Sequence, residues 1–351
     1  MADEDSQRKR RVRYQGTHPR RFQDKYKELN PVADALELEK VRARGQTPAG
    51  THRPICVREI LEILAPKPGE TGLDATLGFG GHTLEILPHL LPDGRLFALD
   101  VDPIELPRTE ARLRAAGFRE DVLVVRRMNF AGLPQLRPEF GEGLDFVLAD
   151  LGVSSMQIDN PARGFTYKAE GPLDLRLNPQ RGKPASALLQ NLGEQELADL
   201  LAENSDEPRA QAIAKAILAA ARDRPVATTT QLARIVRAVV KADGAPGSLE
   251  DETRGALQRT FQALRIAVND EFQVLDQFLS YLPNCLRPGG RVAILSFHSG
   301  EDRRVKKAFQ QGHRDGFYAC IAPELIRPGF EERRDNPRSA SAKLRWAVKE
   351  G

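Results

Sequence analysis

Apolar positions occur along this chain in two patterns: short unbroken runs, and longer stretches in which they recur at helical spacing. The unbroken runs lack the polar alternation of a half-exposed strand and are typical of strands buried on both faces. The first begins at Leu73, and the others occupy residues 94–100, 122–126, 144–150, 291–297 and 344–348. Stretches with helical spacing separate the earlier runs, which predicts a parallel, doubly wound α/β sheet. In such sheets ligands bind at the carboxyl ends of the strands.

Between the fourth and fifth runs the pattern changes to alanine- and leucine-rich helical spacing. Thr228 and Gln231 have the spacing of a capping box at the start of one of these helices. We predict helices over 194–203, 209–221 and 231–241, followed by one long helix over 253–282. The block therefore predicts an inserted all-helical domain over 158–262, with the sheet domain formed by 51–157 and 263–351.

The stretch from Leu73 to Thr83 is expected to form a strand, a glycine turn and the start of a helix. Glycines reach positive φ without strain, and the free N–H groups of a helix start can bind a ligand. Thr76 replaces the first glycine of the dinucleotide fingerprint. The stretch resembles instead the D-x-T-x-G-x-G-G-H loop with which class I methyltransferases bind S-adenosylmethionine. A purely structural turn is the alternative.

Acidic residues follow the second apolar run, where Asp100 ends the predicted strand and Asp102 precedes the next helix. An acid at the end of the second strand of a βαβ unit is placed to accept the hydroxyls of an adenosine ribose. Both acids could instead cap the helix that begins at Pro103. Together with the glycine turn, they predict an adenosine-containing ligand.

Composition limits the classes of function and place. The 351 residues suffice for two domains. With 52 basic and 49 acidic residues the net charge is only +3, so the charge of the chain as a whole does not indicate nucleic-acid binding. The three cysteines lie far apart, as expected in the reducing cytoplasm. No apolar run predicts a membrane span or a signal peptide. Residues 1–50 are polar, with basic clusters, which predicts a disordered extension; an RNA-binding arm is the alternative.

Several motifs occur in collinear order from His52 to Arg345. They are Asp74-x-Thr76-x-Gly78-x-Gly80-Gly81-His82, Asp150-Leu151-Gly152-Val153-Ser154-Ser155, Arg163-Gly164-Phe165, Gly171-Pro172-Leu173-Asp174, Arg259-Thr260-Phe261-Gln262-Ala263-Leu264-Arg265, Ser296-Phe297-His298-Ser299, Glu301-Asp302-Arg303 and Asn336-Pro337-Arg338. Together they closely resemble the ribosomal RNA small subunit methyltransferase H family. The chain departs from the family at Gly300, at Ala340 and over 255–258.

The resemblance implies a class I fold with an inserted helical domain. It also implies methylation of the exocyclic N4 of a decoding-centre cytidine in 16S rRNA of the small ribosomal subunit, with S-adenosylmethionine as cofactor and no metal. The family's cofactor contacts carry over to Gly80, Gly81, His82, Asp100, Phe130, Asp150 and Gln157. A methyltransferase for another RNA base or a protein, and a non-catalytic RNA-binding assembly factor, are the alternatives. The sequence leaves the oligomeric state open.

Asp150 is the candidate catalytic residue, because an acceptor near the cytosine amino hydrogens would stabilise the charge that develops on that nitrogen. A loop-capping role is the alternative. The chain has no Pro-Cys pair near the fourth strand, which argues against methylation of a ring carbon through a cysteine adduct. His298 could line the base pocket or simply pack. Candidate phosphate contacts are Arg163, Arg176, Arg303, Arg304 and Arg338.

Overall fold

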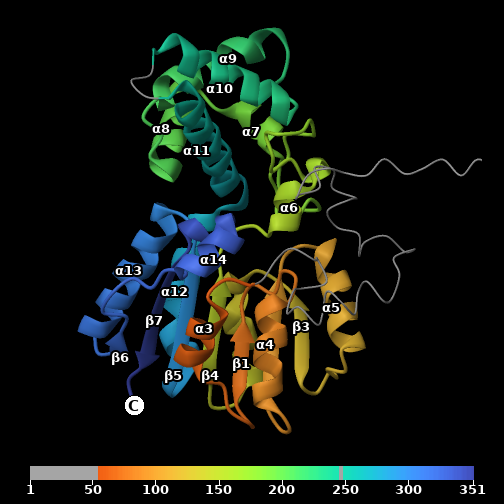
Figure 1. Ribbon diagram of the computed structural model, residues 1–351, viewed down its shortest axis with the longest axis vertical. Helices are drawn as coiled ribbons and strands as arrows, with labels where there is room; N and C mark the ends of the chain where they lie inside the picture. Colours follow the sequence, from red (N-terminus) through yellow and green to blue (C-terminus); the bar gives the residue numbers. More distant parts are fainter. Residues whose placement is uncertain (1–53, 245–247) are drawn as a thin grey trace, which may run out of the picture. The chain divides into compact units, whose positions relative to one another are not determined.

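A seven-stranded sheet forms the centre of the computed structural model, which describes residues 54–244 and 248–351 (Figure 1). The predicted disordered extension over 1–50 lies outside the described residues. The strands run in the order β3-β2-β1-β4-β5-β7-β6. Their bounds are β1 Thr71–Asp74, β2 Arg95–Asp100, β3 Leu123–Arg127, β4 Leu144–Asp150, β5 Leu286–Ser296, β6 Tyr318–Ile321 and β7 Lys343–Lys349.

Strands β1 to β5 pair in parallel, while β7 runs antiparallel to both β5 and β6. The order reverses between β1 and β4, which makes the carboxyl ends of these two strands the switch point where ligands bind. The predicted class I methyltransferase fold is therefore confirmed, including the final strand. Strand β6 was not predicted, because it is short and two of its residues, Ala319 and Cys320, are exposed.

Helices cover both faces of the sheet, which explains why its central strands β1, β2, β4 and β5 are mostly buried. Side chains of one strand alternate between the faces: Leu96 and Phe146 pack on one side, Phe97 and Val147 on the other. The first side is covered by α3 (Val57–Leu64), α4 (Gly81–Leu90) and α5 (Glu105–Ala115), the second by the 3-10 helix η2 (Phe130–Phe140), α12 (Glu271–Cys285) and α13 (Ser299–Arg314).

A separate hydrophobic cluster lies in the segment between β4 and β5, with members from Phe165 to Leu264. Its helices are α7 (Ala185–Asn191), α8 (Glu194–Ser205), α9 (Ala210–Asp223), α10 (Thr229–Ala242) and α11 (Leu249–Asn269). The capping box of Thr228 and Gln231 is present at the start of α10, as predicted. The domain boundaries at 158 and 262 stay a prediction.

The prediction of one long helix over 253–282 is wrong. Helix α11 ends at Asn269 and α12 begins at Glu271, with Asp270 between them at a φ of 51°. The side-chain amide of Asn269 donates to the Leu175 carbonyl at 2.8 Å and its oxygen accepts the Leu177 N–H at 2.7 Å. The break therefore ties α11 to the loop after β4. Asn and Asp tolerate left-handed backbone better than other non-glycine residues, so the pair was the available signal.

The described part of the chain contains no helix with both the length and the apolar character needed to cross a membrane.

Candidate active site

The glycine turn after β1 takes its shape from Asp74. One carboxylate oxygen accepts the N–H of Thr76 at 3.1 Å, and the other accepts the hydroxyl of Thr83, in the first turn of α4, at 2.7 Å. Burial raises the pKa of Asp74. Both Gly78 and Gly80 lie in the left-handed region, with φ of 49° and 71°. The turn therefore needs glycine at these positions, and Asp74 is committed to holding it.

The two acids at and just after the end of β2, Asp100 and Asp102, differ in role: one caps a helix, and the other keeps the capacity to accept a ligand. Asp102 is fully buried and accepts the N–H groups of Ile104 at 2.9 Å and Glu105 at 3.3 Å, so it caps α5. Asp100 accepts the N–H of Gly78 on one oxygen and that of Asp102 on the other, each at 2.8 Å. Burial raises the pKa of Asp100 to about 6. Each of its oxygens keeps a second lone pair, so it can still accept hydrogen bonds from a ligand.

Asp150 ends β4 at the switch point, next to the glycine turn. Its backbone N–H donates to the Thr76 hydroxyl at 2.6 Å. Oδ1 of its carboxylate is buried and has no hydrogen-bond partner among the described residues. Oδ2 lies 3.6 Å from Nδ1 of His82. A buried acceptor without a partner is costly, so the carboxylate is aimed at a donor that the described residues do not supply.

Asp150 and His82 form a pair that can hold a proton. Nε2 of His82 lies 3.0 Å from the carbonyl oxygen of Ile55 and must donate to it, which leaves Nδ1 facing the carboxylate. An unprotonated Nδ1 would point its lone pair at an ionised carboxylate. The arrangement is therefore best satisfied with one further proton shared by the two groups.

The charge around Asp150 explains its titration. Burial raises the pKa of Asp150 to about 6; the imidazole of His82 opposes this shift, while the carboxylates of Asp74 and Glu301 add to it. The Asp150 carboxyl is consequently poised to take up or release a proton in the weakly acidic range.

Gln157 and Arg163 meet at the buried carboxylate of Asp102. Nε2 of Gln157 donates to Oδ2 at 2.7 Å, and Nη1 of Arg163 donates to the same oxygen at 2.6 Å. Oε1 of Gln157 accepts the N–H of Ser154 at 2.9 Å. The amide of Gln157, predicted as a cofactor contact, is thus engaged within the protein, and its contact with a cofactor stays a prediction.

The predicted phosphate contact at Arg163 is contradicted by the structure. Arg163 is only 6 % exposed, and its guanidinium also donates to the carbonyls of Arg176 and Leu177, at 3.2 and 2.9 Å. A guanidinium so enclosed cannot reach an RNA phosphate. Sequence could not separate it from a surface arginine, because its partner Asp102 lies far away along the chain.

The other four candidate arginines keep part of their side chains at the surface but have partners. Arg176 binds Asp174 through two nitrogens, and Arg338 donates to Asp159 at 2.7 Å. Arg303 and Arg304 approach Asp206 and Asp276, respectively. Their contact with RNA stays a prediction.

Phe130 and His298 are both held in the fold. Phe130 begins η2 and packs its ring against Phe278, with centroids 5.0 Å apart. Nδ1 of His298 accepts the N–H of Glu301 at the start of α13, and its Nε2 lies 3.1 Å from the Glu301 carboxylate. Both ring nitrogens of His298 thus face its own helix start, which favours the packing role over a part in the base pocket.

Sequence reasoning missed the segment before α3, which closes one side of the Asp150 pair. The carbonyl of Ile55 supports His82, and the buried thiol of Cys56 lies close enough for Asp150 to affect it. Burial, with Glu332, Glu59 and Asp150 adding, raises the pKa of Cys56 to about 12, so the thiol stays protonated and is a poor nucleophile. No sequence pattern indicates a contact made by a backbone carbonyl.

The chain is similar in sequence to proteins named as ribosomal RNA methyltransferases. The sequence pattern of the MraW methylase family matches residues 49–350. A protein of Alkaliphilus metalliredigens named ribosomal RNA small subunit methyltransferase H 2 is 55% identical over 99% of this chain and 100% of its own. A protein of Lachnoclostridium phytofermentans named ribosomal RNA small subunit methyltransferase H 1 is 52% identical over 97% of this chain and 93% of its own. A protein of the same name in Agathobacter rectalis is 50% identical over 99% of each chain.

Proposed function

The chain belongs to the MraW methylase family, and we propose that it methylates the exocyclic N4 of a decoding-centre cytidine in 16S rRNA, with S-adenosylmethionine as the methyl donor. The names of its relatives support ribosomal RNA of the small subunit as the substrate. The choice of N4 and of the decoding centre rests on the motif resemblance. The single observation that carries a catalytic site is the unpartnered Oδ1 of Asp150 at the switch point of the sheet.

The residues around the glycine turn fit S-adenosylmethionine. The turn is free of Cβ atoms at Gly78 and Gly80, the carboxylate of Asp100 keeps acceptor capacity, and Oδ1 of Asp150 lacks a donor. We expect the cofactor to be held by Gly80, Gly81, His82, Asp100, Phe130, Asp150 and Gln157. When bound, it supplies a methyl group on a sulfonium, which is electrophilic without help from a metal.

The protein's first task is to align the cytosine amino group with that methyl. Alignment of two reactants can remove about 7 to 11 kcal/mol of a barrier in ideal cases. The amino lone pair is delocalised into the cytosine ring, so the free amino group is a weak nucleophile. Oδ1 of Asp150 is placed to accept one N–H of that group, which favours the pyramidal nitrogen and stabilises its developing positive charge.

The second task is to take up a proton. Transfer of the methyl group from the bound cofactor would break its carbon–sulfur bond and would leave the amino nitrogen with one proton too many. That proton passes to the unpartnered Oδ1 of Asp150. The methylated cytidine is then neutral, and Asp150 releases the proton to solvent.

The cytidine has to leave its stack to reach this carboxylate, at a cost of about a few kcal/mol that is least in single-stranded RNA. We propose that the helical domain over 158–262 helps to hold the RNA, and that the protein works in the cytoplasm on the small ribosomal subunit.

The test is a labelled methyl transfer assay on 30S subunits isolated from a strain that lacks this modification. The expected product is N4-methylcytidine, identified by mass spectrometry of the nucleosides. Asp150→Ala should abolish it while leaving S-adenosylmethionine binding measurable by calorimetry.

The outcomes separate the alternatives. Methylation of another atom or of a protein would overturn the substrate assignment and leave the methyltransferase. Cofactor binding without transfer to subunits or naked RNA would favour a binding role, and unchanged activity in Asp150→Ala would remove Asp150 from the mechanism.

A further inference from the structure

One aromatic ring stands out on the described surface. Phe330 begins α14 (Phe330–Asp335) and is 73 % exposed, whereas the next most exposed large hydrophobic residue, Leu249, is 49 % exposed. Exposing a phenylalanine ring to this extent forgoes most of the free energy that its burial would provide. Sequence reasoning did not single it out, because no sequence pattern shows whether an isolated phenylalanine is exposed.

Arg333 and Arg334 follow Phe330 by three and four residues in α14 and so share its face of the helix, which also carries the exposed acids Glu331 and Asp335 nearby. Arg327 and Arg333 are exposed, and their side chains have no hydrogen-bond or ion-pair partner in the part of the chain that the structure describes. Arg334 is bound only to its neighbour Asp335, in an exposed pair of the kind that contributes little. We call Arg327, Phe330, Arg333 and Arg334 the Phe330 surface. Free guanidinium groups beside an exposed ring are the chemistry that binds phosphates and stacks bases.

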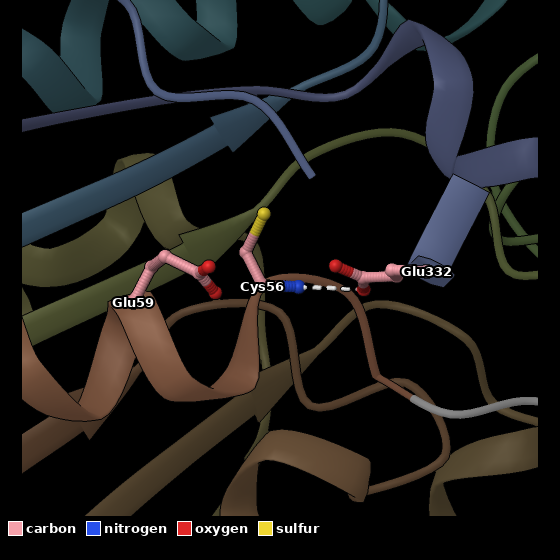
Figure 2. Close-up of side chains that lie close together, drawn as sticks. All are labelled: Cys56, Glu59 and Glu332. Carbon is pink, nitrogen blue, oxygen red and sulfur yellow. Dashed lines mark hydrogen bonds between the residues drawn. The ribbon is translucent and has the colours of Figure 1, made fainter. Parts of the chain in front are cut away.

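Two contacts, one made from within α14 and one made just after it, hold the helix beside the candidate active site. The Glu332 carboxylate accepts the backbone N–H of Cys56 at 2.9 Å, as Figure 2 shows, with Glu59 on the other side of Cys56. Just beyond α14, Arg338 donates to Asp159, which ends the short helix α6 (Ser155–Asp159) after β4. Figure 1 accordingly draws α14 beyond the carboxyl ends of the strands. The Phe330 surface thus borders the edge of the sheet where Asp150 lies.

We propose that Phe330 is a stacking platform for an RNA base adjacent to the target cytidine, with Arg327 and Arg333 bound to the flanking phosphates. This inference rests on the proposed function, since it concerns the RNA of the same site. A cytidine that leaves its stack uncovers the face of its neighbour, and an exposed ring at the mouth of the site can replace the lost stacking. The arginines explain why an RNA strand fits this surface better than an apolar protein partner.

A second exposed phenylalanine provides a matched control. Phe317 is 45 % exposed and has Nζ of Lys349 5.6 Å from its ring centroid, so it too combines an exposed ring with a cation. It precedes β6, whose first residue pairs with Lys349 at the end of β7. Since β7 is antiparallel to β5, that end lies at the opposite edge of the sheet from Asp150. Both rings are thus exposed, although to different extents, and they lie at opposite edges of the sheet.

The experiment compares Phe330→Ala, Phe330→Trp and Phe317→Ala in the full chain. Binding of 30S subunits is measured by sedimentation, S-adenosylmethionine binding by calorimetry, and methyl transfer by steady-state kinetics. Phe330→Ala should weaken subunit binding by about 5- to 100-fold, the range expected for one stacked base, and should raise KM for subunits correspondingly. Phe330→Trp should retain binding, and Phe317→Ala should behave as the parent. Cofactor affinity should stay within about twofold in all three.

The arginines are tested by salt. Arg327→Gln and Arg333→Gln should each weaken subunit binding and lower the slope of log affinity against log salt by about 0.7, as expected for one phosphate contact to a single strand. Equal subunit binding by Phe330→Ala and Phe317→Ala, or parallel loss of cofactor affinity in Phe330→Ala, would overturn the proposal. So would failure of the parent chain to bind subunits. Binding without N4 methylation would instead overturn the proposed reaction alone.

Discussion

Asp102, just after β2, and Asp150, at the end of β4, each bring a buried carboxylate oxygen to the same edge of the sheet, but the two have opposite surroundings. Oδ2 of Asp102 receives both Arg163 and Gln157, and its Oδ1 accepts two N–H groups of α5. Oδ1 of Asp150 receives nothing from the described residues. Both carboxylate oxygens of Asp102 thus have hydrogen-bond partners, whereas Oδ1 of Asp150 has none among the described residues.

This difference separates a structural acid from a functional one. A buried carboxylate with all its partners present stabilises the fold only as long as they stay, and removal of one partner leaves a charge uncompensated. A buried acceptor without a partner lowers stability and persists where a ligand or substrate completes it. Asp102 and Asp150 should therefore respond to the same substitution in opposite ways.

The largest effect is expected from Asp102→Asn. The substitution leaves the guanidinium of Arg163 buried without a counter-charge, which should lower the free energy of unfolding by about 3 to 5 kcal/mol. Urea denaturation measures the change. Asp121→Asn is the control, since Asp121 pairs with Arg119 in an exposed position and its substitution should leave the stability unchanged. A stable Asp102→Asn protein would show that the Asp102 group is not structural.

Asp150→Asn is expected to do the reverse. It removes a carboxylate whose Oδ1 has no partner, so the free energy of unfolding should stay the same or rise. The rate of methyl transfer should fall by about 100- to 1000-fold, the usual loss when one group that stabilises transition-state charge is removed. Denaturation and single-turnover kinetics on the same preparation give both values. A loss of stability as large as that of Asp102→Asn would erase the distinction between the two acids.

The pH dependence should run in opposite directions for rate and stability. Burial raises the pKa of Asp150 from 3.8 to about 6, so the folded chain binds protons more tightly than the unfolded chain between these values. Stability should therefore fall as pH rises from about 4 to 6, because ionising the buried acid is unfavourable. The rate should rise over the upper part of that range, because only the carboxylate accepts the substrate's N–H.

Asp150→Asn is the control for this titration. Asp100, whose pKa burial also raises to about 6, adds to the same stability trend and remains in that variant. The other titratable groups that affect Asp150 are His82, Asp74 and Glu301, and Asp150 in turn affects Cys56. A rate that keeps its rise near pH 6 in Asp150→Asn would assign the titration to one of these groups.

The smallest effect is expected from Gln157→Ala. It removes one hydrogen bond to the Asp102 carboxylate, while Arg163 and the N–H groups of α5 remain, so unfolding should become easier by about 1 to 3 kcal/mol. Calorimetry should also show weaker S-adenosylmethionine binding, as the family resemblance implies. Loss of stability with unchanged cofactor affinity would place Gln157 with the structural group alone.

The sequence by itself determined the sheet, the glycine turn and the position of the acids at the strand ends. These features are local: an unbroken apolar run indicates a strand covered on both faces, and a glycine cluster indicates a turn that needs positive φ. The capping box at Thr228 and the final strand were likewise predictable, because each depends on residues close together in the chain. The motif order then indicated the family.

Only the tertiary structure decided which side chains find hydrogen-bonding or packing partners. Arg163 was expected at RNA and is buried on Asp102, the long helix over 253–282 breaks at Asp270, and Phe330 is exposed beside the site. In each case the deciding contact, or its absence, joins segments far apart in the sequence, and the energy of a buried polar group depends on those partners. Periodicity reports which face of an element is apolar, and it carries no information about which distant group meets a given side chain.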